Sequence, residues 1–150
     1  MSLDVYLEVE HAAEVGSDPF IYVRVGGRTR SVSRAEWDIL YPGREPVMVT
    51  QENETMTVYH GNITHNLGKM AKAAGIYPAL WRPEEVGIVK AGNLVEPLQK
   101  GLAELRADPE RFEALNPENG WGTYEGLLAF AAEYLIACMV YPEATIRVWR

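Results

Sequence analysis

Residues 1–10, MSLDVYLEVE, alternate apolar and polar side chains along their whole length. A period of two with one polar face is typical of a half-buried strand. Residues 144–150, ATIRVWR, repeat the pattern, with Ile146 and Val148 on one side. Because the two stretches resemble each other in length and patterning, we expect them to be neighbours in one sheet whose apolar face is covered by helices.

The middle of the chain, from Asn62 to Pro142, carries mostly helical signals. Apolar residues recur there at helical spacing, in stripes over residues 67–74, 91–105 and 127–138. Pro97 lies inside the second stripe and should kink or split that helix, while residues 76–82 are expected to form an aromatic loop. The sequence therefore predicts an α+β fold, with a small antiparallel sheet that includes the first and last strands, packed by three to four helices.

Residues 18–54 have turn signals of their own. Two β-rich runs, 20–25 and 28–32, flank Gly26-Gly27, a pair typical of a tight hairpin turn. Residues 33–36 then form a capping box that opens a short helix. We expect one domain over residues 1–150, with residues 18–54 as an inserted hairpin-plus-helix arm.

Composition excludes several classes of function. The 150 residues are 47% hydrophobic with a formal net charge of -7, which fits a globular chain and disfavours general nucleic-acid binding. Neither a secretion signal nor a membrane-length apolar run is seen, so a cytoplasmic location is expected. Cys138, the single cysteine, is interpreted as a core residue. No phosphate-loop or zinc pattern occurs, and the spacing of His11, His60 and His65 has no fixed geometry, so we expect no cofactor and no metal.

The first candidate site stretch is residues 59–66, YHGNITHN, where a strand runs into a helix. Helix starts offer unpaired N–H groups to ligands. Asn62 or Thr64 would cap this helix, and His65 and Asn66 would face a ligand from its first turn. The alternative is that Asn62 and Thr64 are ordinary caps and His65 merely packs.

The second stretch is residues 77–85, YPALWRPEE. Trp81 could stack on a planar ligand, and Arg82 could clamp a carboxylate or phosphate. The alternative is that Trp81 anchors the segment to the core while Arg82 pairs with Glu85.

The third stretch is residues 116–124, NPENGWGTY, which precedes another helix. Its candidate ligand-binding residues are Asn116, Asn119, Trp121 and Tyr124; the alternative is a helix-entry turn plugged by its tryptophan. If the three stretches meet, they would line a small-molecule pocket of aromatic and hydrogen-bonding groups.

Three functions compete on these observations. The first is a protein that binds a small polar or nucleotide-like ligand, or a host protein, through the three stretches. The second is a hydrolase or transferase with His65 as general base and Glu84 or Glu118 as its partner. The third is a structural protein, such as a homo-oligomer, that uses the arm as its contact element. The aromatic and apolar anchors of the arm would be Phe20, Tyr22, Trp37, Ile39 and Tyr41.

Three strings carry a family resemblance: residues 62–85, NITHNLGKMAKAAGIYPALWRPEE, residues 107–138, ADPERFEALNPENGWGTYEGLLAFAAEYLIAC, and the terminal PEATIRVWR. In these the chain resembles uncharacterised small proteins of bacteriophage and prophage genomes, over residues 4–10 and 59–150. Residues 20–54 depart from that family. The resemblance implies a viral or mobile-element source and an accessory role, such as host takeover, anti-defence or a minor virion part. It assigns no functional residue.

Overall fold

The computed structural model describes residues 1–11, 20–46, 48–49 and 54–150. The chain divides into two compact units. The body consists of Met1–Val9 and Met56–Arg150, and the arm consists of Glu10–Thr55. The predicted insertion at residues 18–54 falls within the arm.

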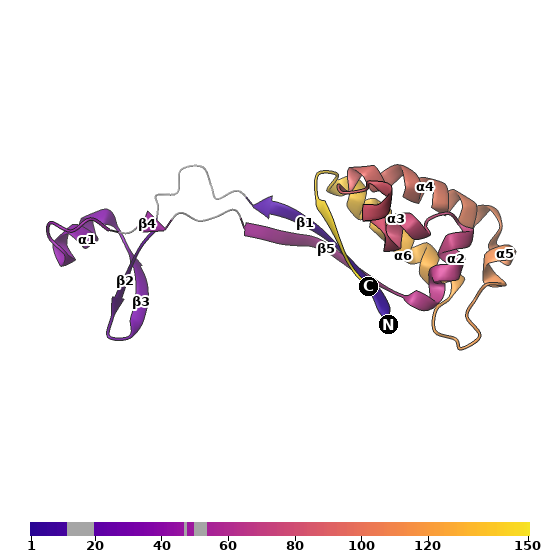
Figure 1. Ribbon diagram of the computed structural model, residues 1–150, viewed down its shortest axis with the longest axis horizontal. Coiled ribbons are helices and arrows are strands. Elements are labelled where there is room, and N and C mark those ends of the chain that lie inside the picture. The colour runs from indigo at the N-terminus through magenta and orange to yellow at the C-terminus, as the bar shows by residue number, and fades with distance from the viewer. Residues whose placement is uncertain (12–19, 47, 50–53) are drawn as a thin grey trace. The chain divides into compact units, whose positions relative to one another are not determined.

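The body is built on a three-stranded antiparallel sheet in the order β5-β1-β6. These strands are β1 (Ser2–His11), β5 (Glu54–Thr64) and β6 (Thr145–Trp149). Val5 lies opposite Val148, and Leu7 opposite Ile146, so the apolar sides of the first and last strands form one face. The predicted pairing of these strands is confirmed, and it places the two chain ends close together (Figure 1).

Helices cover one face of this sheet (Figure 1). In chain order they are η1 (His65–Leu67), α2 (Gly68–Ala73), α3 (Tyr77–Trp81), η2 (Pro83–Val86), α4 (Gly92–Ala107), α5 (Pro109–Glu113) and α6 (Tyr124–Val140). The α+β class is confirmed. Several helices are only one or two turns long, and for this reason they outnumber the expected three to four.

One local prediction for the helical part was wrong, and another holds at most in one of its two forms. Residues 77–81 form α3 rather than a loop, because Pro78 lies in its first turn, where a missing N–H costs nothing. Helix α4 runs from Gly92 to Ala107 with Pro97 inside it, so of the two expected effects, a kink or a split, the split does not occur. None of the helices among the described residues is long and apolar enough to cross a membrane.

The core of the body lies between the sheet and the two long helices. Leu3, Val5 and Leu7 are fully buried, and so is Cys138 of α6. Burial raises the pKa of the Cys138 thiol to about 12, so this group stays protonated and behaves as a small core residue.

The arm contains β2 (Phe20–Val25), β3 (Arg28–Val32), α1 (Arg34–Leu40) and β4 (Met48–Val49), with strand order β3-β2-β4. The predicted hairpin is confirmed. The predicted cap is also present, since Ser33 Oγ accepts a hydrogen bond from the Glu36 backbone N–H at 3.1 Å. The arm has a small core of its own, Ile21, Val23 and Val32.

The proposed arm anchors have different surroundings. Trp37 and Tyr41 pack against the arm's own core, whereas Ile39 is 79% exposed. The side chains of Phe20 and Tyr22 lie outside what the structure describes.

Candidate functional site

A cavity of about 780 Å³ opens in the body between the end of β5 and the loop that precedes α6. Its lining residues are Met1, Ser2, Asn62, Thr64, His65, Asn66, Asn119 and Trp121. Two of the three predicted stretches therefore share one cavity. None of these side chains is Asp, Glu, Lys or Arg, so the side chains of the wall offer hydrogen-bonding groups but no carboxylate, ammonium or guanidinium group.

The first wall is the junction of β5 with η1. Thr64 is the N-cap residue, and its Oγ1 accepts a hydrogen bond from the Asn66 backbone N–H at 3.3 Å. The His65 backbone N–H donates to the Met1 carbonyl oxygen at 3.3 Å. These bonds fix the turn from which His65 and Asn66 line the cavity.

The second wall is the loop of residues 114–123. Asn119 Oδ1 accepts a hydrogen bond from the Trp121 backbone N–H at 2.9 Å, which closes a tight turn. The loop leaves the Trp121 side chain 72% exposed. A large aromatic ring held this open by a fixed turn is available for stacking.

The two walls are joined directly. The Asn66 side-chain amide donates to the Trp121 carbonyl oxygen at 3.2 Å. Gly122 has a φ of +114°, and a Cβ at this position would lie 2.9 Å from both Leu67 Cγ and Thr64 Cγ2. Only glycine allows the loop to approach the first wall so closely.

His65 is held in one tautomer by a buried tryptophan. Trp81 Nε1 lies 2.8 Å from His65 Nδ1, and an indole N–H can only donate. Nδ1 is therefore the acceptor, and the proton of the neutral ring is on Nε2. His65 consequently offers a hydrogen-bond donor through Nε2.

The amide of Asn62 is also fixed by its partners. Its Nδ2 donates to Ser2 Oγ at 3.0 Å and to Asp4 Oδ1 at 2.9 Å. Both N–H groups are used, so Oδ1 remains as an acceptor. The hydrogen bonds from Asn62 and then His60 hold the pKa of Asp4 below its usual value, so the carboxylate that orients Asn62 stays ionised.

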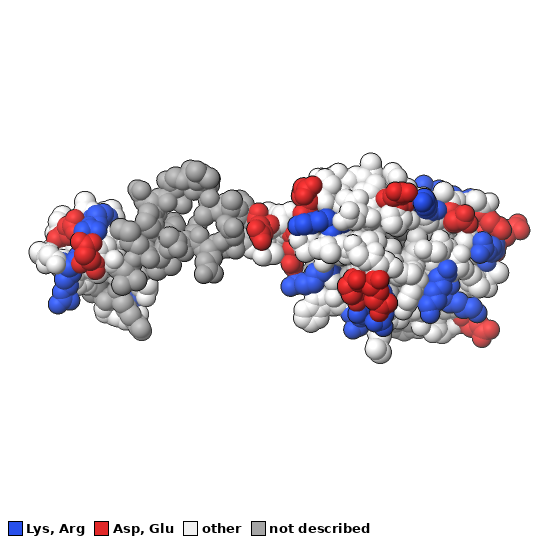
Figure 2. Space-filling view, turned by 45° about the horizontal axis from the view of Figure 1, so that its top comes forward, with Lys and Arg blue, Asp and Glu red and all other residues white. Residues whose placement is uncertain are grey.

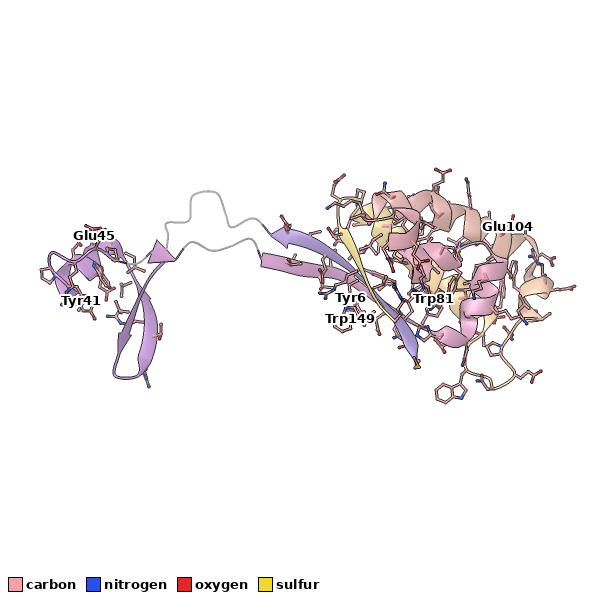
Figure 3. All side chains as sticks on the ribbon, viewed as in Figure 1. Tyr6, Tyr41, Glu45, Trp81, Glu104 and Trp149 are labelled. Atoms are coloured by element: carbon pink, nitrogen blue, oxygen red, sulfur yellow. The ribbon has the colours of Figure 1, made fainter. Side chains whose placement is uncertain are left out.

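Four predicted ligand-binding residues do not line the cavity. Trp81 is 2% exposed and lies between the sheet and the helices (Figure 3). Arg82 pairs with Glu85 at 3.5 Å. Tyr124 is buried, and its hydroxyl donates to the Leu105 carbonyl oxygen at 2.7 Å. Asn116 Oδ1 accepts from the Tyr124 backbone N–H at 2.7 Å. Trp81 and Arg82 have the roles that were weighed as alternatives for their stretch. In the third stretch the alternative of a tryptophan plug was wrong, because Trp121 is exposed and Tyr124 is the buried ring.

The carboxylates proposed as partners of His65 lie elsewhere. Glu84 pairs with Arg150, and this ion pair lowers the pKa of Glu84. Glu118 is exposed and is not part of the cavity wall.

Sequence reasoning missed Met1, Ser2 and Thr64 as lining residues. Thr64 was recognised only as a cap. The alternation of residues 1–10 places Ser2 on the polar side of the first strand, and this pattern was the available signal for its exposure. That signal shows a face of the strand, but it does not show which residue will stand beside Asn62.

A second cavity in the body, of about 710 Å³, lies against α4. Its wall is mostly apolar, and two of its polar side chains, Glu96 and Lys100, pair with each other at 3.0 Å. The cavity beside Trp121 is apolar in about the same proportion, and it is favoured because it joins two of the predicted stretches.

Neither a charged patch nor a metal cluster marks a further site on the parts of the body described below. On the face shown in Figure 2, acidic and basic side chains of the body are interspersed and form no broad patch of one sign. Within the described ranges, no cluster of three or more His, Cys, Asp or Glu residues could hold a metal ion.

Comparison with known proteins gave no match to a family model, a curated protein or a solved structure.

Proposed function

We propose that the body binds a small uncharged ligand whose ring carries several hydrogen-bonding groups, as a sugar or a nucleoside does. One observation carries this proposal: two segments more than fifty residues apart in sequence form one cavity with fixed polar groups and an exposed tryptophan. Its volume of about 780 Å³ lies in the range usual for small-molecule sites.

The fixed groups define the ligand's chemistry. His65 Nε2 and the amide N–H groups of Asn119 are donors, while Asn62 Oδ1 is an acceptor. Hydroxyl and ring-amide groups satisfy both kinds of partner. The ring of Trp121 offers an apolar face to the flat side of such a ligand. A phosphate would find no lysine or arginine on this wall.

The same geometry argues against His65 as a general base. Its Nδ1 already accepts a hydrogen bond from Trp81, and its Nε2 carries the proton. Neither nitrogen is free to take a proton from a substrate, and no carboxylate lines the cavity. Binding therefore explains the site better than hydrolysis or group transfer does.

Titration calorimetry of the full chain against neutral monosaccharides and nucleosides tests the proposal. We expect at least one of the two classes to bind, and the matching sugar phosphate or nucleotide to bind no more tightly. Trp121→Ala should lower the affinity about tenfold, because a stacked aromatic contributes roughly 1–3 kcal/mol. Trp149→Ala removes a comparably exposed tryptophan that does not line the cavity, so it should bind like the wild type.

Three results would contradict this proposal. The first is the absence of saturable binding by either class, and the second is wild-type affinity in Trp121→Ala. A clear preference for the phosphorylated ligands would also contradict it, since it would require a cationic wall.

The cellular setting remains a proposal that rests on the resemblance to bacteriophage proteins. It favours an accessory protein in the cytoplasm of a bacterial or infected host cell. A host protein as partner, or a homo-oligomer formed through the arm, is compatible with ligand binding by the body. The exposed side chain of Ile39 supports a contact role for the arm.

A further inference from the structure

The sheet of the body has a second face, opposite the helices, and we call it the open face. It is formed by the polar side of each strand: Asp4, Tyr6 and Glu8 of β1, His60 and Asn62 of β5, and Thr145, Arg147 and Trp149 of β6. Figure 3 shows Tyr6 and Trp149 beside the strands on the side away from the helices.

Flat side chains on this face are in contact across all three strands. The rings of Tyr6 and His60 are stacked, with centroids 4.6 Å apart and planes 12° apart. The Arg147 guanidinium lies 5.2 Å from the Tyr6 ring and 5.9 Å from the Trp149 ring. Trp149 is 62% exposed, so the row ends in a large ring that is open to a ligand.

The charges of the open face are balanced by its own residues. Arg147 pairs with Glu8 at 2.7 Å, and the Asp4 carboxylate lies 2.9 Å from His60 Nε2. Lys90 reaches this face at Thr145, where its Nζ donates to Oγ1 at 3.1 Å. The carboxylates of Asp4 and Glu8 therefore balance the cations of Arg147 and Lys90. This balance leaves no excess positive charge for a phosphodiester chain. An uncharged partner matches this surface.

The open face continues into the cavity. Asn62 lines the cavity and donates to Asp4 of the open face, and Asp4 lies opposite Trp149 in the sheet register. Trp149 is therefore two strand spacings, about 10 Å, from Asn62. This span is longer than one sugar ring, so a ligand held in the cavity would need additional units to reach Trp149.

We infer that the open face is a platform for the further units of a neutral oligosaccharide whose first unit occupies the cavity. This inference rests on the proposed function and narrows its ligand class to saccharides. Sugar rings present an apolar C–H side to aromatic rings and hydroxyl groups to Asp4, Asn62 and Arg147. Because the Tyr6 ring is already stacked on His60 and lies against Arg147, the aromatic contact that adds affinity for a longer chain would be with Trp149.

The test is calorimetric titration of the full chain with neutral oligosaccharide series, from the monosaccharide to the hexasaccharide. The wild type should bind longer chains about tenfold more tightly than the monosaccharide. Trp149→Ala should abolish this gain without changing monosaccharide affinity, and Trp149→Phe should restore part of it. Trp121→Ala should weaken the binding of every length. Since Trp149 is exposed, an unchanged circular dichroism spectrum and melting temperature are expected for both Trp149 variants.

Several outcomes would overturn the inference, and each also bears on the proposed function. If the monosaccharide binds but chain length has no effect, the platform is disproved while the cavity proposal stands. If only nucleosides bind, the saccharide class is wrong and the cavity remains a binding site. If no ligand binds, both fail. Tighter binding of a single-stranded oligonucleotide would assign the open face to a nucleic acid instead. If sedimentation shows that the wild type self-associates and Trp149→Ala does not, the open face belongs to a second copy.

Discussion

Asp4 connects the polar groups of the sheet to the cavity at the scale of a single residue. Its carboxylate accepts hydrogen bonds from Asn62 and His60, both on β5. These bonds lower the pKa of Asp4 from its usual 3.8. A carboxyl group with a lowered pKa in the folded state stabilises the fold only while it is ionised.

The acid sensitivity of folding should therefore depend on Asp4. Its contribution is fully present above its unfolded pKa and is lost as the pH falls through the lower folded value. In Asp4→Asn we expect a free energy of unfolding lower by about 1 kcal/mol at neutral pH. The variant should also lose less stability than the wild type between about pH 5 and about pH 2.

Urea unfolding followed by circular dichroism at a series of pH values measures this difference. Glu143→Gln is a suitable control, because Glu143 is an exposed carboxylate with no ion pair among the described residues. The control should keep the wild-type acid profile. Parallel pH profiles for wild type and Asp4→Asn would show that the two hydrogen bonds contribute nothing through the ionised form.

The loop of residues 114–123 illustrates how an element is held in place by close approach. Gly120 and Gly122 both have positive φ, +73° and +114°, but only Gly122 has neighbours where a Cβ would be. A left-handed backbone costs a non-glycine residue about 1–2 kcal/mol. A forced overlap in a packed site adds roughly 1–3 kcal/mol.

Paired alanine substitutions separate these two effects. Gly120→Ala should lower the free energy of unfolding by about 1–2 kcal/mol. Gly122→Ala should lower it further, by roughly 1–3 kcal/mol, and should also weaken ligand binding because Trp121 is displaced. Chemical denaturation gives the first quantity and calorimetry the second. If both variants lose the same free energy of unfolding, the loop can move away from Leu67 and Thr64 at no cost, and close approach does not hold it in place.

Local patterns in the sequence were sufficient to predict many of the elements. Alternation predicted β1 and β6, the Gly26-Gly27 turn predicted the hairpin, and the capping box predicted the start of α1. These features are encoded within a few residues, so no distant contact is needed to recognise them. The cap of η1 was narrowed to Asn62 or Thr64, and the structure shows that it is Thr64.

Features that depend on tertiary packing could not be predicted in this way. Residues 77–81 were expected to be a loop, yet they form a helix whose buried Trp81 orients His65 from the core. Burial of Trp81 was weighed as an alternative, but no local signal shows that its indole N–H will donate to His65, sixteen residues earlier. The side-chain contacts on the polar strand faces were missed for a similar reason, since only the register shows that Tyr6 lies opposite Arg147.

At the scale of the whole molecule, the two units differ in how much core they contain. The body has a continuous core to which β1, α4 and α6 all contribute side chains. The described core of the arm is limited to Ile21, Val23 and Val32, against which Trp37 and Tyr41 pack. Small cores provide little stability because they bury little apolar surface.

This difference should be visible in native-state hydrogen exchange. Backbone amides of β2 and β3 are paired in the arm, as in the register of Ile21 with Val32, so they should be protected. We expect them to exchange through opening reactions of lower free energy than the amides of Leu3, Val5 and Leu7 in β1. Mass spectrometry or nuclear magnetic resonance at several denaturant concentrations can compare the two sets. Amides of the arm that are protected as strongly as those of β1 would show that its stability has a source beyond its described core.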